Sequence, residues 1–297
     1  MVHHDKCPLC SSDIIKEYLQ TSDYFLTGEK FKLSQCSSCG FIFTRDHPDG
    51  EGISRYYESA GYISHNDSAK GISASVYRLV REFMLKKKRN LVCKTTGLKN
   101  GKILDIGSGT GHFLSFMHKS GWEVKATEIN EKAREFSKEQ YGIEVLPPEN
   151  IGSLPYASFD AITLWHVLEH FQDPFAIAEE ISRLLKPGGT CFIALPNCSS
   201  YDASHYREFW AAYDVPRHLW HFSPDTFRLF AEKNGFGIYK MRPLSFDVFY
   251  ISILSEKYKK TSLSFIIGTL KGLWFFILSL FNAKRSSSLI YVIHKNV

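Results

Sequence analysis

The chain has 297 residues, of which 44% are hydrophobic and 23% charged, and 36 basic residues against 31 acidic ones give a net charge of +5. This composition can bury a sizeable core and excludes a disordered, collagen-like or mucin-like protein. The length predicts one large domain with a smaller companion. Because the N-terminus has no apolar run and the chain holds seven cysteines, we expect reduced thiols in a cytoplasmic protein.

Four of the cysteines form two closely spaced pairs, Cys7-Pro-Leu-Cys10 and Cys36-Ser-Ser-Cys39. Two such turns complete a tetrahedron around zinc, and an all-cysteine set is typical of a structural site. The 25 residues between the pairs can hold a hairpin with short strands at 18–20 and 31–33, followed by 41–43. We therefore predict a zinc ribbon over residues 1–47. The alternative is two pairs of ordinary thiols, and the other three cysteines are interpreted as small apolar residues.

Residues 48–100 are predicted to form a helical linker or cap. A short helix and loop are expected over 54–62. Apolar residues then recur at helical spacing from Val76 to Met84, and the helix is expected to end in the basic run 86–89. Basic residues oppose the dipole at a helix C-terminus, so a solvated helix end is favoured over a nucleic-acid patch.

After Gly101 the pattern changes to alternating strands and helices. Buried strands are predicted at 102–106, 124–128, 160–164 and 191–195, with helices at 112–117, 130–141 and 174–186 between them. Ser223 and Pro224 are predicted to begin a further helix. This alternation predicts an α/β fold with a doubly wound parallel sheet over residues 101–297, in which ligands bind at the carboxyl ends of the strands.

The first strand leads into the glycine loop Asp105-Ile-Gly107-Ser108-Gly109-Thr-Gly111. A dinucleotide fingerprint needs its third glycine at position 112, which is His112. A carboxylate at this helix N-terminus would repel the pyrophosphate of NAD or FAD.

S-Adenosylmethionine instead brings an ammonium group, which Asp105 could attract. Glu128 follows 23 residues later at the end of the second strand. An acid in that register can accept hydrogen bonds from both ribose hydroxyls. The loop and the two acids together favour S-adenosylmethionine.

These residues, with Leu154-Pro-Tyr156, Leu168-Glu-His170 and Leu185-Lys-Pro-Gly-Gly189, resemble class I S-adenosylmethionine-dependent methyltransferases. The resemblance implies a seven-stranded, Rossmann-like sheet whose last strand, at 289–294, is antiparallel and lies beside the fifth. The cysteine module is similar to one in a branch linked to sugar and polysaccharide biosynthesis. The implied cofactor contacts are Asp105, Gly107, Ser108, Gly109, Gly111, Glu128, Ile129, Asn150, Ile151 and Trp165.

Two histidine clusters are candidates for acting on the acceptor. His166 follows the strand at 160–164 and is interpreted as a general base or an orienting group, with a structural histidine as the alternative. Arg217, His218 and His221 belong to a loop expected above the sheet. There Arg217 could clamp a phosphate or carboxylate, and His218 is preferred to His221 as a base. The alternative is that Arg217 and His218 only pin the loop.

Residues 246–284 are predicted to be a hydrophobic helical insert, whose segment 264–281 approaches the length of a membrane span. A single crossing would leave the strand at 289–294 on the wrong side of the bilayer. We therefore expect an interfacial helix that places a cytoplasmic protein at the inner face of the membrane. A dimer surface or a lid is the alternative.

The sequence thus predicts an S-adenosylmethionine-dependent methyltransferase with structural zinc and a small-molecule acceptor, such as a nucleotide sugar, a glycan or a lipid-linked intermediate. One alternative is an RNA methyltransferase that grips RNA through the ribbon. The segment from Cys7 to Cys39 is not strongly basic, so a nucleic-acid partner is not expected. The other alternative is a non-catalytic module that binds S-adenosylmethionine.

Overall fold

The computed structural model describes residues 1–57 and 72–296, with side chains from residue 79 onward in the second range. By their contacts the described residues fall into two units. Unit 1 draws on 1–58, 168–174 and 194–291, and unit 2 on 59–167, 175–193 and 292–297. The units do not coincide with the expected segments 1–47, 48–100 and 101–297, whose boundaries stay predictions.

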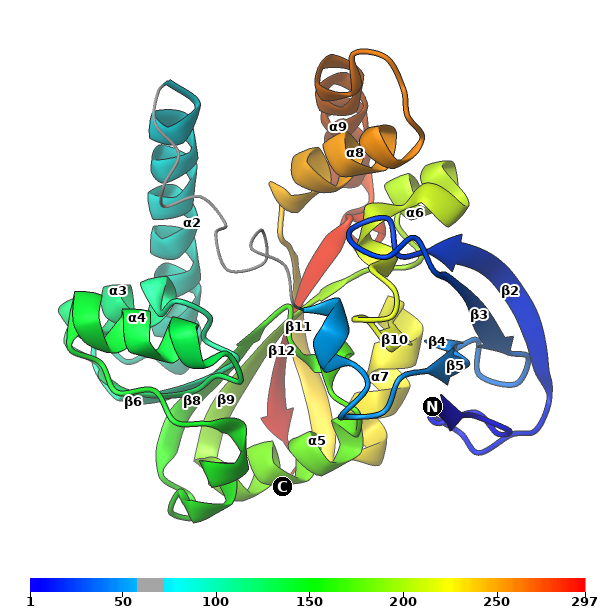
Figure 1. Ribbon diagram of the computed structural model, residues 1–297. Coiled ribbons are helices and arrows are strands. Elements are labelled where there is room, and N and C mark those ends of the chain that lie inside the picture. The colour runs from blue at the N-terminus through cyan, green and yellow to red at the C-terminus, as the bar shows by residue number, and fades with distance from the viewer. Residues whose placement is uncertain (58–71, 297) are drawn as a thin grey trace. The chain divides into compact units, whose positions relative to one another are not determined.

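A six-stranded sheet in the order β11-β12-β9-β8-β6-β7 forms the Rossmann-like framework (Figure 1). Its strands are β6 (Lys102–Ile106), β7 (Glu123–Thr127), β8 (Phe159–Trp165), β9 (Leu185–Pro196), β11 (Phe236–Pro243) and β12 (Ser288–Lys295). β6 pairs in parallel with β7 and β8. The predicted fold class is confirmed, and β12 lies beside β9 as expected.

The resemblance implies seven strands, but the sheet has six strands in the described part of the chain. An isolated parallel bridge between Thr127 and Leu146 stands at the β7 edge. The segment after it begins with Pro147 and Pro148, and proline lacks the N–H that a longer ladder would need.

In unit 2, α2 (Ile72–Thr96), α3 (His112–Lys119) and α4 (Glu131–Tyr141) accompany the strands, and α5 (Pro174–Leu184) precedes β9. The predicted end of α2 at residues 86–89 is wrong. Val92 continues the apolar face and packs with Ile103 and Trp122 in a buried cluster, so burial extends the helix past the lysines.

Unit 1 contains a second, antiparallel sheet in the order β10-β4-β3-β2. Its strands are β2 (Ile15–Ser22), β3 (Lys30–Cys36), β4 (Ile42–Thr44) and β10 (Trp220–His221), and the short β1 (Val2–His3) pairs with β5 (Asp46–His47). The predicted hairpin is therefore confirmed. β10 is not expected from the sequence, which indicates a loop there, and it pairs with β4 where the rings of Phe41 and Trp220 stack 6.3 Å apart.

The remaining helices of unit 1 are α6 (Tyr201–Tyr206), α7 (Pro224–Lys233), α8 (Asp247–Tyr258) and α9 (Ser264–Phe281). Short 3-10 helices occur at Ser54–Tyr56, Leu168–His170, Arg207–Phe209, Ala211–Tyr213 and Ala283–Arg285, and another at Pro148–Ser153 in unit 2. Ser223 caps α7 as predicted. Of the short helix expected over 54–62, residues 58–62 lie outside the described part.

Candidate functional site

Unit 2 carries the glycine loop, which follows β6 and leads into α3. Gly107 has φ +70°, and a Cβ there would lie 2.6 Å from the side chain of Val167. Gly111 has φ +79°, and a Cβ there would lie 2.5 Å from the Ser137 hydroxyl. Both positions therefore require glycine for space as well as for backbone conformation, and they let the loop pass close to its neighbours.

Asp105 lies at the end of β6 and is 2% exposed. Burial raises the pKa of this carboxyl to about 7, although a hydrogen bond from the Thr163 hydroxyl opposes the rise. A cation placed beside the group would favour its ionised form. The position suits the ammonium of an amino-acid moiety better than a phosphate.

Glu128 directly follows β7 and connects that strand end to the glycine loop. One carboxylate oxygen accepts the N–H of Gly109 at 2.8 Å and the other accepts the N–H of Asn130 at 2.9 Å. Each oxygen keeps a second lone pair. The carboxylate is thus held in a fixed orientation and can still accept hydrogen bonds from a ribose.

The other predicted cofactor residues are spread over three segments of unit 2. Ile129 is 79% exposed, and Asn150 and Ile151 belong to the 3-10 helix Pro148–Ser153, which Arg183 holds through the Ile151 carbonyl at 3.0 Å. Trp165 ends β8, with the Lys88 ammonium 4.2 Å from its ring centre. Their roles toward a cofactor stay predictions.

His166 follows β8 with φ +61°, a left-handed conformation that is uncommon for a residue with a side chain. Such backbone strain is concentrated at functional sites. The turn directs the chain so that Val167 contacts Gly107. The structure thus gives His166 a distinctive backbone position, and its role as a base stays a prediction.

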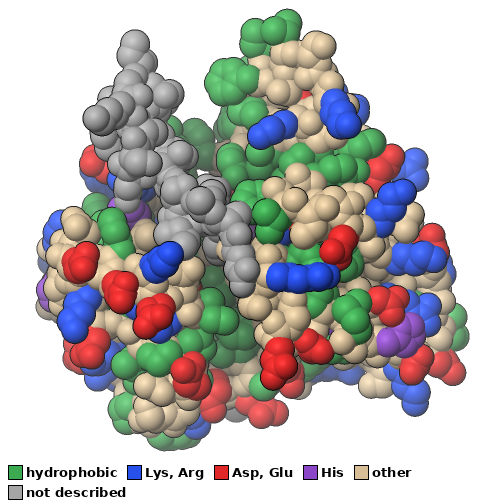
Figure 2. Space-filling view, in the orientation of Figure 1, with side chains coloured by type: hydrophobic (Ala, Val, Ile, Leu, Met, Phe, Trp, Pro, Cys, Tyr) green, Lys and Arg blue, Asp and Glu red, His purple; other side chains and the backbone are tan. Residues whose placement is uncertain are grey.

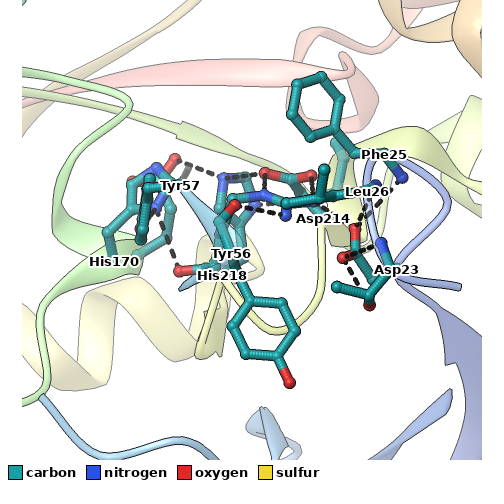
Figure 3. A network of polar contacts seen from close by, with 12 residues as sticks. Asp23, Phe25, Leu26, Tyr56, Tyr57, His170, Asp214 and His218 are labelled. Carbon is teal, nitrogen blue, oxygen red and sulfur yellow. Dashed lines mark hydrogen bonds and ion pairs between the residues drawn. The ribbon is translucent and has the colours of Figure 1, made fainter. Parts of the chain in front are cut away.

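In unit 1, His218 lies in a polar network with His170 (Figure 3). Nδ1 of His218 donates to the Ala212 carbonyl at 2.9 Å, and the two imidazole rings meet edge to face with centres 4.5 Å apart. Burial and the nearby His218 lower the pKa of His170 to about 4. The Tyr57 hydroxyl lies 3.0 Å from Nδ1 of His170.

Arg217 is 1% exposed, and its guanidinium is occupied by the protein itself. It donates to Asp214 at 2.7 and 3.0 Å, to Asp23 at 2.8 Å and to the Tyr56 carbonyl at 3.1 Å. This arrangement matches the loop-pinning alternative. A role of Arg217 toward an acceptor stays a prediction.

His221 lies in β10 and is 4% exposed. Its Nε2 donates to the Thr44 hydroxyl at 3.2 Å, and that hydroxyl donates to the His218 carbonyl at 3.0 Å. Burial lowers the pKa of His221 to about 3. The residue therefore stabilises the β4–β10 pair as a neutral imidazole.

The four N-terminal cysteines come together as the sequence predicts. Their sulfur atoms all lie within 4.8 Å of one another, with Cys7–Cys39 at 3.6 Å and Cys10–Cys36 at 3.5 Å, and all are free thiols. Zn–S bonds of about 2.3 Å in a tetrahedron place sulfur atoms roughly 3.8 Å apart. The donor set fits zinc in type and in size.

Sequence reasoning missed the partners of His218 and Arg217. From the sequence, Glu169 and His170 are assigned only to a family motif, and nothing connects Asp23 with Arg217. A usable signal is the pair Glu169-His170, which lies three and four positions after His166, since polar residues that follow a parallel strand gather at the ligand edge of a sheet.

Comparison with known proteins agrees with this geometry. A family model described as "Methyltransferase domain" matches residues 77–240, more than half of the chain. The ubiquinone biosynthesis O-methyltransferase of Xanthomonas campestris pv. campestris (strain B100) is 35% identical over 113 residues. This match covers 36% of the present chain and 47% of that protein, so the chain spans about half the length of the curated relatives it matches.

Two solved structures resemble the chain at the level of fold. The geranyl diphosphate C-methyltransferase of Streptomyces coelicolor A3(2), in complex with Mg²⁺, geranyl diphosphate and S-adenosyl-L-homocysteine, gives a TM-score of 0.52 at 13% identity over 80% of this chain and 88% of that one. The cyclase SpnF gives a TM-score of 0.52 at 15% identity, over 84% of this chain and 98% of that one. These likenesses show the fold, and the family match over more than half of the chain shows that it belongs to the class I S-adenosylmethionine-dependent methyltransferases.

Proposed function

We propose that this protein transfers the methyl group of S-adenosylmethionine to an oxygen of a small-molecule acceptor. The observation that carries the proposal is the Glu128 carboxylate, held by two backbone N–H groups beside the glycine loop. The O-methyltransferase name of the curated relative supports an oxygen acceptor. In this reaction the acceptor oxygen attacks the methyl carbon, the carbon–sulfur bond breaks to release S-adenosylhomocysteine, and the hydroxyl proton passes to a base or to water.

Replacing Glu128 with alanine is expected to weaken S-adenosylmethionine binding at least about tenfold, because a charge-assisted hydrogen bond contributes about 1.5–3 kcal/mol. Calorimetric titration of wild type and variant measures this, with NAD as the competing ligand class. Glu131→Ala is the matched control, since it removes the same charge from an exposed position three residues away. The cofactor assignment would be contradicted if the protein bound NAD, or if wild type and Glu128→Ala bound S-adenosylmethionine with equal affinity.

We also propose that Cys7, Cys10, Cys36 and Cys39 bind a structural zinc ion. The sulfur–sulfur distances support it, as does the small core of the surrounding sheet, which alone would stabilise so short a segment poorly. When bound, zinc would cross-link the turn before β2 to the turn after β3. The site has four protein ligands and leaves no position for an acceptor.

Finally, we propose that the protein acts in the cytoplasm at an anionic membrane surface, through α9. Of the described helices, this one is long and apolar enough to cross a membrane, yet only 22% of it is buried. Phe265, Leu270, Trp274 and Phe281 are 57–86% exposed. The one charged residue, Lys271, is turned inward and pairs with the buried Glu256 at 2.6 Å.

A helix on a water-facing surface turns its charged side chains outward and its apolar side chains inward, and α9 has the opposite arrangement. Gly268 and Gly272 bring α9 against α8, since a Cβ at Gly268 would lie 2.5 Å from the Ile253 backbone. Figure 2 shows hydrophobic and basic side chains together on this helical pair. Exposed lysines at 257, 259, 260 and 284 flank the apolar face and suit anionic headgroups. Of the acceptor classes named above, a lipid-linked one fits best.

Flotation with vesicles tests this surface. Wild type is expected to float with vesicles containing phosphatidylserine. A double variant that carries both Leu270→Glu and Trp274→Glu is expected not to float. Tyr239→Glu, which alters a residue 67% exposed on β11, is the control and should still float. Concentration-dependent dimerisation without flotation, lost in the same variant, would instead make α9 an interface between copies.

A further inference from the structure

We propose that Glu169, His170 and His218 bind a divalent transition-metal ion, at a site separate from the four cysteines. The three side chains offer one carboxylate oxygen and two imidazole nitrogens, all within 4.8 Å of one another. Nε2 of His218 lies 4.0 Å from Oε1 of Glu169. All three residues belong to unit 1.

The orientation of the two imidazoles is that of metal ligands. Histidines that bind metal almost always donate their other ring N–H to a carbonyl or carboxylate. Nδ1 of His218 lies 2.9 Å from the Ala212 carbonyl, and Nδ1 of His170 lies 3.1 Å from the Arg217 carbonyl. These partners fix both rings in the tautomer that leaves Nε2 as the lone-pair nitrogen.

The charges around the cluster also favour a cation. Glu169 is 1% exposed, and the neighbouring Asp214 and Asp23 already share Arg217 (Figure 3). In their ionised forms Asp23 and Asp214 carry two negative charges, and Arg217 supplies one positive charge. Buried charge is costly unless it is compensated. These acidic surroundings favour a cation over an anion at the three ligand atoms.

The ligand types select the class of metal. Two imidazoles and one carboxylate suit zinc, iron(II) or cobalt(II) better than calcium or magnesium, and three protein ligands leave coordination positions open. Bonds of about 2.1 Å require ligand atoms roughly 3.0–3.5 Å apart. Nε2 of His218 and Oε1 of Glu169, which lie 4.0 Å apart, therefore need to close by about 0.5–1 Å on binding, which changes in side-chain torsion can supply.

An open coordination position would let the metal activate a bound hydroxyl group. A hydroxyl oxygen bound there would lose its proton more readily, as water does on zinc. Binding of the metal itself does not rest on the proposed function.

The test uses the full chain with its cysteine site first filled with zinc and excess metal removed. Cobalt(II) is then titrated and followed by calorimetry and by its visible absorption spectrum. We expect one cobalt per chain, without the thiolate-to-cobalt charge-transfer bands that cysteine ligation produces. His218→Ala and Glu169→Gln are each expected to weaken binding at least about tenfold.

Glu169→Gln keeps the shape of the side chain, so it tests the ligand even if an alanine variant fails to fold. His205→Asn is the matched control, because His205 is an exposed histidine outside the cluster, and it should bind cobalt as wild type does. No binding, thiolate bands, or equal affinity in wild type and Glu169→Gln would overturn the proposal. None of these readouts depends on S-adenosylmethionine, so the site can fail while the methyltransferase assignment stands.

Discussion

Cys36→Ser is expected to release the ribbon zinc and to lower the free energy of unfolding by several kcal/mol. Structural zinc contributes about 10–16 kcal/mol of binding free energy in isolated zinc-finger peptides, and part of that is lost with one of four ligands. The loss of stability should extend beyond the ribbon, because β4 pairs with β10 in the same sheet. Zinc release to a chromophoric chelator and urea unfolding measure the two effects.

Cys93→Ser is the control, because Cys93 is a free thiol in α2 and lies outside the cluster. It should keep the zinc content and stability of wild type. Hydrogen exchange adds a spatial readout, since amides of β4 and β10 should lose protection together in Cys36→Ser. An unchanged zinc content in that variant would contradict zinc ligation by this residue.

Arg217→Met is expected to destabilise unit 1 by about 3–5 kcal/mol, the usual cost of removing one partner from a buried ion pair. Asp23 has a fully buried side chain, and both Asp23 and Asp214 would lose their cationic partner. Arg217→Lys should recover only part of the loss, because lysine cannot reproduce the forked hydrogen bonds. Urea unfolding of the three proteins measures the series.

The pairing of Asp23 with Arg217 should also make the stability of the fold depend on pH. Burial alone would raise the pKa of Asp23, but the hydrogen bond and charge of Arg217 bring it below the ordinary value. A lowered pKa contributes stability that is present above the unfolded value, near 4, and is lost as the pH falls through the folded value. Wild type should therefore lose stability below about pH 4, and Arg217→Met should lose less. Identical pH profiles would show that the pair does not titrate in this way.

The glycine loop and the strands on either side of it could be predicted because their signals are local. Asp105, three glycines and Glu128 lie within one strand–helix–strand unit, and the residue types follow from the backbone conformation. The ribbon hairpin was predictable for the same reason, since paired cysteines flank it.

The polar network of unit 1 could not be predicted, because its members come from distant parts of the chain. Asp23 meets Arg217 across 194 positions, and Thr44 meets His221 across 177. No periodicity or spacing connects such residues. The length of α2 was missed because a run of lysines resembles a helix end, and only the tertiary packing of Val92 overrides it.

The pairing of β4 with β10 also bears on the order in which the chain is made. Roughly 175 residues separate the two strands, and a ribosome adds them in about 10–35 s at about 5–20 residues per second. During that interval the open edge of β4 has no neighbour, and an uncovered strand edge invites pairing with other nascent chains. Zinc bound early by the two cysteine turns would hold the hairpin in register until β10 emerges, so metal supply during translation should govern the yield of folded protein.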